Sequence, residues 1–319
     1  MRKNNVSERF QQTALEGIRM FKNLDLDKNI NFILAGGIFV ISFAGIFVAL
    51  SDAPPLVIAF YRMFLSVIIL TPTFILRRDC HLSLFKDLRP VVVGFFLAIH
   101  FILWVSAFEY TAVANAVIFI ALQPIFTLLF EAIWAREDLR PGIMIGVLLA
   151  VTGSFVVGMG DLGNLFANVF GDTLAVLAAF FAGLYLFSGR SLRRELDYFP
   201  YIYIVYSYAS LFLVLGVLIS GTSFTGYGTS NWLYFIGLAA GPTVIGHSVL
   251  NLAVRYVPTT LVSVAIIGEP ILTTILAWIL LGDRITILTF VGGAMILSGV
   301  VYTMLKQSRR ATTTPPQEH

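Results

Sequence analysis

Residues 107–153 read AFEYTAVANAVIFIALQPIFTLLFEAIWAREDLRPGIMIGVLLAVTG, and residues 253–299 repeat this pattern without a gap at an offset of 146. The positions that match in the two copies are Tyr110 with Tyr256, Pro124 with Pro270, Thr127 with Thr273, Gly146 with Gly292 and Gly153 with Gly299. Residues 55–61 are echoed at 200–206, at an offset of 145. Such internal similarity indicates that one structural unit occurs twice in the chain.

Apolar runs around and between these copies are long enough to cross a bilayer as helices. They lie at residues 31–50, 55–76, 91–109, 112–134, 141–159, 172–188, 199–219, 231–250, 257–281 and 286–305. A hydrophobic fraction of 58% and a charged fraction of 12% lie far outside the range of soluble globular proteins. The sequence therefore predicts an all-α integral membrane protein with ten transmembrane helices.

The basic residues give an independent check on this threading. Nineteen of the 21 Lys and Arg residues fall on one side of the membrane, Arg284 falls on the other side, and Arg62 lies inside a span. Because cytoplasmic loops carry the excess of basic residues, this side is the cytoplasm. We expect a multi-pass protein of the cytoplasmic (inner) membrane with both termini in the cytoplasm.

Each copy of the unit contains five predicted spans, at 30–160 and 161–305. Since five is odd, the second copy enters the membrane from the opposite side, which predicts two inverted five-helix repeats. Inverted repeats give many secondary transporters their two access states. Residues 1–29 form a cytoplasmic segment, either an amphipathic helix on the membrane surface or a flexible polar lead, and residues 306–319 form a cytoplasmic polar tail.

Several motifs in both halves carry a family resemblance. They are Tyr61-Arg62, Glu109-Tyr-Thr-Ala-Val-Ala114, Gly246-His-Ser-Val-Leu-Asn251, Gly268-Glu-Pro270 and Leu281-Gly-Asp283. The chain resembles, over roughly residues 30–305, the EamA-type module of the drug/metabolite transporter superfamily, present twice. The resemblance implies ten helices, a central cavity between the two bundles, and transport of small metabolites by alternating access. Asp283 departs from the Glu that is usual in the family.

Glu269 is the strongest candidate for a functional residue inside the membrane. It lies near the middle of the ninth predicted span, directly before Pro270, which removes a backbone hydrogen bond and favours a kink, as Pro124 does in the fourth span. A carboxylate beside a loosened turn can bind a cationic group or take up a proton; a fixed ion pair with Arg62 is the structural alternative. The repeat-equivalent residue is Gln123, so the carboxylate occurs in one half only.

Arg62 is the basic residue inside the second predicted span. It follows Pro55 by two turns, which places it about 10 Å below the outer surface at 1.5 Å per residue. At that depth a charge needs a partner, and Glu269 lies at a similar depth. Arg62 is therefore either a structural or gating residue, or a contact for an anionic group of the substrate. Tyr61 beside it is a further candidate for substrate binding.

Two histidines occupy nearly equivalent places in the two halves, His100 in the third span and His247 in the eighth. They either flank a central cavity and titrate near neutral pH, or act as neutral hydrogen-bonding groups between helices. Trp104 lies one turn beyond His100 and is either a cavity wall or a core residue. Asn251 extends a polar stripe from His247.

Other site types lack their signatures. The single cysteine, Cys80, excludes an intrachain disulfide, and neither a metal-ligand spacing nor a nucleotide-binding motif is present, so no metal and no cofactor is predicted. The chain lacks the pattern of a cleaved signal peptide. Paired glycines at Gly36-Gly37 and Gly292-Gly293 favour close approach of helices.

The leading prediction is a secondary transporter, an exporter of small metabolites or amino-acid-like compounds, with proton coupling left open. A passive facilitator or channel is the first alternative, and a membrane-embedded enzyme is the second, although the expected catalytic motifs are absent. The predicted partners are a small-molecule substrate and the lipid bilayer. Nucleic acid is not among them, and the sequence is compatible with a homodimer.

Overall fold

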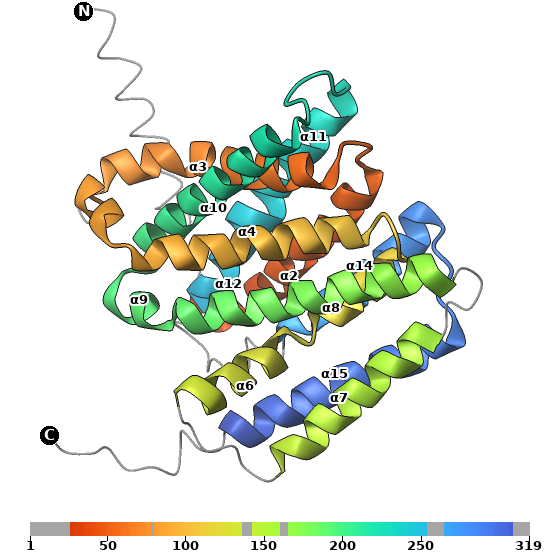
Figure 1. Ribbon diagram of the computed structural model, residues 1–319. Helices are drawn as coiled ribbons and strands as arrows, with labels where there is room; N and C mark the ends of the chain where they lie inside the picture. Colours follow the sequence, from red (N-terminus) through yellow and green to blue (C-terminus); the bar gives the residue numbers. More distant parts are fainter. Residues whose placement is uncertain (1–25, 78–79, 136–141, 160–164, 254–264, 309–319) are drawn as a thin grey trace, which may run out of the picture.

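The computed structural model describes residues 26–77, 80–135, 142–159, 165–253 and 265–308, which form helices and contain no strand (Figure 1). The first three spans are α2, α3 and α4, with η1 before α4. The bounds are α2 Leu26–Leu50, α3 Pro55–Leu76, η1 Leu82–Lys86, α4 Arg89–Ala107, α5 Val113–Ile120, α6 Gln123–Trp134, α7 Ile143–Gly158, α8 Leu165–Ser188, α9 Arg190–Glu195, α10 Tyr198–Ser220, α11 Thr229–Leu238, η3 Ala239–Gly246, α12 His247–Ala253, α14 Gly268–Leu281 and α15 Ile287–Ser308. The predicted N-terminal helix and most of the polar tail lie outside these ranges.

Each of the ten predicted spans coincides with at least one helix. Within the described ranges, eight helical segments are long and apolar enough to cross a membrane, and two others, Ile143–Val157 and Gly268–Leu281, are apolar but shorter. The second of these belongs to the ninth predicted span, whose first part, residues 257–264, lies outside the described residues. The prediction of an all-helical protein with multiple apolar spans is confirmed.

Helix ends follow from local chemistry. Pro55 opens α3, where its missing N–H has no partner to lose. Gly221 and Gly282 follow α10 and α14 with φ of +69° and +73°, the left-handed conformation that ends helices and favours glycine. The turns that connect the spans are therefore specified by proline and glycine.

The two matching prolines of the repeat, Pro124 and Pro270, lie in the first turns of helices and not in the middle of continuous helices. The fourth span is interrupted between α5 and α6, and Pro124 is the second residue of α6. Pro270 is the third residue of α14. Because first-turn amides have no intrahelical acceptor, proline costs little there. The predicted kinks are thus breaks, which leave Gln123 and Glu269 at helix starts.

Glycines bring α7 and α15 into close contact, side by side in Figure 1. A Cβ atom at Gly153 would lie 2.6 Å from the carbonyl oxygen of Gly292, and one at Gly299 would lie 2.5 Å from that of Gly146. Early residues of one helix thus meet late residues of the other, so the pair runs antiparallel. Of the other predicted pair, Gly37 packs against Val249, whereas a Cβ atom at Gly36 would have no described neighbour within 4 Å, so the structure gives no close helix approach at Gly36 among the described residues.

The helices α3 and α10 form a second antiparallel pair. Leu56 at the start of α3 packs on Gly216 near the end of α10. At the opposite end, Phe74 stacks on Tyr203 with 4.0 Å between ring centroids, and the hydroxyls of Thr71 and Tyr203 are 3.1 Å apart. The helices α3 and α10 are the second spans of the two repeats, and α7 and α15 are the fifth spans. In both pairs, equivalent helices of the two repeats therefore pack antiparallel.

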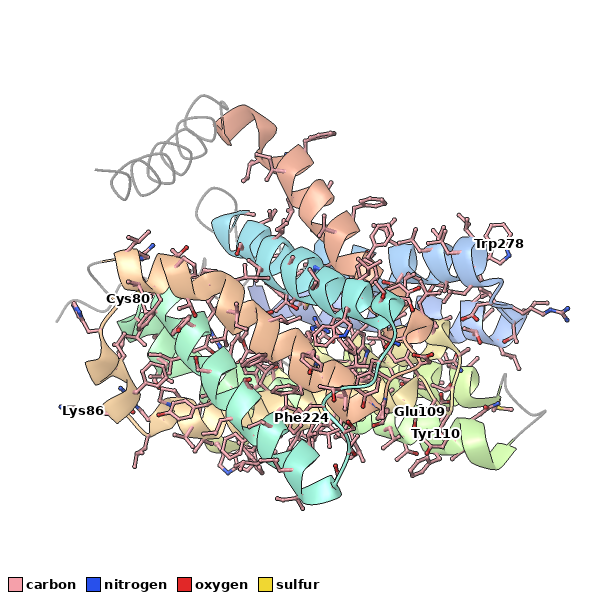
Figure 2. All side chains as sticks on the ribbon, turned by 90° about the horizontal axis from the view of Figure 1, so that it is seen from above. Cys80, Lys86, Glu109, Tyr110, Phe224 and Trp278 are labelled. Carbon is pink, nitrogen blue, oxygen red and sulfur yellow. The ribbon has the colours of Figure 1, made fainter. Side chains whose placement is uncertain are left out.

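We name the two ends of the helix bundle after residues labelled in Figure 2, and call them the Lys86 end and the Glu109 end. At the Lys86 end, Arg89 forms an ion pair with Glu195 at 2.7 Å and Arg77 forms one with Asp197 at 3.5 Å. At the Glu109 end, Ser51 and Asp52 bind the side chain of Asn231. These contacts join α2–α4 of the first half to α9–α11 of the second.

Large apolar side chains cover the outside of the bundle. Trp278, at the periphery in Figure 2, is 59% exposed, and Phe290 and Phe155 are exposed to a similar or greater degree. Soluble monomeric proteins seldom expose so many large apolar side chains. These side chains are suited to contact with lipid.

Candidate functional site

Arg62 lies in the interior, with 3% of its surface exposed. Its Nε donates to the hydroxyl of Thr243 at 2.9 Å, and that hydroxyl donates to the carbonyl of Leu238 at 2.9 Å. The Thr243–Leu238 bond spans five residues because η3 is a π-helix, a wider turn that often occurs at functional sites. The π-turn thus supplies the acceptor that holds one edge of the guanidinium.

Two aromatic rings of α4 flank this guanidinium. Its carbon atom lies 4.3 Å from the ring centroid of Phe101 and 5.4 Å from that of Trp104. The two rings are one helical turn apart, and both residues are buried. Cation–π attraction is strongest where the cation is desolvated, so these rings stabilise a charge that is otherwise costly in the interior.

Two hydrogen-bond donors of this region are buried without a partner among the residues that the structure describes. They are Nη1 of Arg62 and Nε1 of Trp104. A buried donor without an acceptor costs about 1–3 kcal/mol, so two of them in adjacent side chains are unusual for a purely structural core. The arrangement is typical of a binding site.

Glu269 approaches the same region from the first turn of α14. Its carbonyl accepts a hydrogen bond from Ser42 of α2 at 3.4 Å, and Thr273 donates to the carbonyl of Ser42 at 3.0 Å. Within the described part of the chain, its carboxylate forms no ion pair with Arg62, although the two charges interact at longer range. The predicted structural alternative, a fixed ion pair, is therefore not what holds Arg62.

The histidines complete the group. The Nδ1 atom of His100 lies 2.9 Å from the carbonyl of Ala178, a contact between α4 and α8. His247 begins α12 and interacts electrostatically with both Arg62 and His100. We define the Arg62 cluster as Arg62, His100, Phe101, Trp104, Thr243, His247 and Glu269. No group of three His, Cys, Asp or Glu side chains among the described residues could hold a metal ion.

Not every predicted site residue joins the Arg62 cluster. Tyr61 donates to the carbonyl of Phe224 at 2.7 Å and stacks on Phe235, which directs it toward the loop after α10. Gln123 begins α6 half-buried, and no contact between its side chain and the cluster is found among the described residues. Asn251 lies in α12, with its side chain outside the described set.

Sequence reasoning missed Thr243, Phe101 and Tyr206. Tyr206 is buried and close enough to Arg62 for their charges to interact; its position as the repeat equivalent of Tyr61 was the signal that could have identified it. Thr243 follows Pro242 in an apolar run, and nothing in that pattern predicts a π-turn. Phe101 is one of 28 phenylalanines, so its role requires the structure.

A pocket of about 140 Å³ opens at the Glu109 end. Ser51, Asp52 and Glu109 supply its polar lining, and Phe108 forms part of its wall. Phe108 packs edge-to-face on Trp104, with 5.1 Å between ring centroids. Phe108 therefore contacts both this pocket and Trp104 of the Arg62 cluster.

Comparison with known proteins agrees with this arrangement. Residues 28–159 and 169–305 each match the EamA-like transporter family. The uncharacterized transporter YdfC of Bacillus subtilis (strain 168) is 23% identical over 278 residues, covering 86% of this chain and 89% of the relative. An uncharacterized transporter of Archaeoglobus fulgidus is 26% identical over 282 residues, covering 83% and 93%.

A solved structure, described only as the crystal structure of a protein, superposes with a TM-score of 0.61 at 19% identity, over 87% of this chain and 98% of the other. This likeness supports the fold. The two family matches together span most of the chain, one on each half. The chain belongs to the EamA-like transporter family, within the drug/metabolite transporter superfamily.

Proposed function

We propose that the protein is a secondary transporter that exports small metabolites or amino-acid-like compounds across the cytoplasmic membrane by alternating access. Both termini lie in the cytoplasm, and the Lys86 end faces that side. The Arg62 cluster is the central substrate site, and Glu269 takes up a proton or a cationic group of the substrate. Family membership supports membrane transport in general, and the ionisable side chains that both repeats contribute to the Arg62 cluster support a central site.

The observation that carries the proposal is that the ionisable side chains of the Arg62 cluster come from both repeats. Arg62 and His100 come from the first repeat, and His247 and Glu269 come from the second. Within the described part of the chain, Arg62 lies in the interior, near enough to Glu269, His100 and His247 for the ionisation of one group to affect the others. Ionisable groups are costly at such depth, and transporter sites typically lie between repeats near the middle of the membrane. A scaffold would gain nothing from this cost.

The helix pairs α3–α10 and α7–α15 support inversion of the repeats. In each pair, equivalent helices from the two repeats meet with their ends reversed. The contact of Gly146 with Gly299 becomes that of Gly292 with Gly153 when the repeats are exchanged. A two-fold axis in the plane of the membrane produces such reciprocal contacts. The inward-open and outward-open states would then use equivalent helix contacts.

Both ends of the bundle are tied by polar contacts that alternating access would have to break. The ion pair of Arg89 with Glu195 ties α4 to α9 at the Lys86 end. Asn231 ties α11 to Asp52 at the Glu109 end. The Arg89–Glu195 pair is exposed, and exposed ion pairs contribute little stability, so this tie can open at a low energetic cost.

The test begins by comparing metabolites of cells that overproduce the protein with those of cells that lack it. Each enriched or depleted compound is then measured for flux in vesicles, with and without a pH gradient. Glu269→Gln is expected to lower this flux severalfold while protein yield stays near normal. Glu131→Gln is the matched control, because it removes a carboxylate that pairs with Arg190 outside the cluster. Equal flux in wild type and Glu269→Gln at every pH would contradict the proposal.

A further inference from the structure

We infer that the Arg62 cluster is a carboxylate-binding site, in which Arg62 Nη1 and Trp104 Nε1 donate to the carboxylate of a small monocarboxylic solute with an apolar body. The inference rests on the proposed transport function, because it names the chemical group that the central site recognises. It begins from the two buried donors without partners among the described residues.

Arginine and the indole of tryptophan can donate hydrogen bonds but cannot accept them. A ligand that completes this site must therefore supply acceptor atoms and no donor at this point. An anionic oxygen satisfies the requirement best, because one donor is charged and charge-assisted hydrogen bonds are about twice as strong as neutral ones. Neutral amides and alcohols compete poorly with a carboxylate in such a site.

The orientation of the guanidinium suits a planar oxyanion. Thr243 accepts from Nε at 2.9 Å, which fixes one edge of the group. Phe101 and Trp104 lie 4.3 Å and 5.4 Å from its carbon, which restrains the group further. The unpartnered Nη1 is therefore held in place before a ligand arrives, and such preorganisation increases affinity. The planar fork of arginine matches carboxylate geometry.

The charge balance favours a single negative charge on the ligand. The carboxylate of Glu269 already interacts electrostatically with Arg62 without an ion pair between them in the described part of the chain. A dianion such as a phosphate monoester would bring two negative charges to one guanidinium, which leaves one of them without a compensating cation in the interior. The rings of Phe101, Trp104 and Phe108 make the surroundings of the two donors apolar, which suits a solute whose body beyond the carboxylate is apolar.

The test measures binding to the purified full-length protein in detergent by isothermal titration calorimetry, independently of transport. The probes are two matched pairs, phenylacetate with phenylacetamide and L-leucine with L-leucinamide, together with phenyl phosphate. Each carboxylate is expected to bind roughly tenfold to hundredfold more tightly than its amide, the range that hydrogen bonds to a charged group confer. Phenyl phosphate is expected to bind more weakly than phenylacetate.

Two variants locate the binding. Arg62→Gln is expected to abolish the preference for carboxylate over amide, and Trp104→Phe, which keeps an aromatic ring but loses the donor, is expected to reduce carboxylate affinity about threefold to tenfold. Trp278→Phe, an exposed tryptophan far from the cluster, is the control and should bind like wild type. If Arg62→Gln does not fold, Trp104→Phe still decides the question.

Three results would overturn the inference: equal affinity for carboxylates and amides, no binding of either carboxylate at millimolar concentration, or unchanged affinity in Trp104→Phe. Transport failure has a different signature. Carboxylate binding that depends on Trp104, without flux of any solute in vesicles, would contradict the proposed function and leave the carboxylate site standing. Flux of solutes that carry no carboxylate would contradict the carboxylate site and leave the proposed transport function standing.

Discussion

At the residue scale, Arg62 determines the chemistry of the interior. An arginine in a protein keeps its charge at any accessible pH, so its neighbours must compensate a permanent cation. Thr243, Phe101 and Trp104 do this without neutralising it. The arrangement leaves the positive charge able to attract an anionic group, which an ion pair with Glu269 would prevent.

Removing the acceptor for Arg62 should destabilise the protein. In Thr243→Val the side chain keeps its volume but loses the hydroxyl, so Nε of Arg62 becomes a buried donor without a partner. We expect a loss of about 1–3 kcal/mol, seen as a lower midpoint of thermal unfolding in detergent. Thr274→Val is the matched control, because the Thr274 hydroxyl is itself buried without a partner among the described residues, and that change should be neutral or stabilising. Equal effects of the two substitutions would show that Thr243 does not support Arg62.

The sequence predicted the ionisable members of the cluster but not their supports. Arg62, His100, His247 and Glu269 stand out because each is costly in an apolar span. Thr243 does not, since a threonine in a span can satisfy its hydroxyl on its own helix, as Thr71 does with the carbonyl of Val67. The distinction between a fixed ion pair and two separated charges also required the three-dimensional arrangement.

At the scale of elements, glycine spacing explains how helices of the two repeats meet. The contact of α7 with α15 depends on Gly146, Gly153, Gly292 and Gly299, because side chains there would displace the neighbouring backbone. The sequence predicted the repeat of these glycines but not that the two helices pack on each other. Most of the span limits that the structure describes lie within a few residues of the predicted ones, since apolar runs end at charged and turn residues, but α8 begins at Leu165, ahead of the predicted start at residue 172.

Overpacking this contact should be costly. A Cβ atom at Gly153 would meet the carbonyl oxygen of Gly292 at 2.6 Å, too close for the helices to stay in place. We expect Gly153→Ala to lower the free energy of unfolding by about 1–3 kcal/mol. Gly36→Ala is the control, because nothing lies within 4 Å of that position; its midpoint should not fall. A Gly153→Ala midpoint equal to that of wild type would mean that the two helices are free to separate.

Two carboxylates outside the spans should give stability opposite dependences on pH. Burial raises the pKa of Asp283, partly offset by the hydrogen bond from the Val113 amide at 3.2 Å, so its contribution is fully present below pH about 3.9 and is lost as pH rises through the folded value. The hydrogen bond with Arg89 lowers the pKa of Glu195, so its contribution is present above pH about 4.3 and is lost as pH falls.

Variants at these positions test the signs by thermal unfolding between about pH 2.5 and pH 8, because the Glu195 contribution changes below pH about 4.3 and the Asp283 contribution changes above pH about 3.9. Relative to wild type, Asp283→Asn should become more stable as pH rises, while Glu195→Gln should become less stable over the same interval. The Glu195 effect should be small and should shrink in high salt, because the ion pair is exposed. A difference from wild type that is constant with pH would refute the assignment for that residue.

At the scale of the whole molecule, the proposed inversion relates the two halves that the family matches cover. Counting spans per repeat predicted the inversion, because an odd number reverses the second copy. The reciprocal contacts of α3 with α10 and of α7 with α15 are what the inversion requires. The sequence could not predict which helices from different repeats meet at the centre, since such contacts depend on packing between segments far apart in the chain.

Repeat-equivalent loops provide the decisive test of inversion. The connection between α3 and α4 and the connection between α10 and α11 follow the second span of each repeat, so inversion puts them on opposite sides of the membrane. In a Cys80→Ser background, Lys86→Cys should react with a membrane-impermeant maleimide only after the cells are permeabilised, because the proposed topology puts the Lys86 end in the cytoplasm. Ser230→Cys should react in intact cells. Both side chains are exposed in the structure, so poor access within the protein would not mask the result. If both cysteines react from the same side, the two repeats share one orientation, and reciprocal opening of a common site would lose its structural basis.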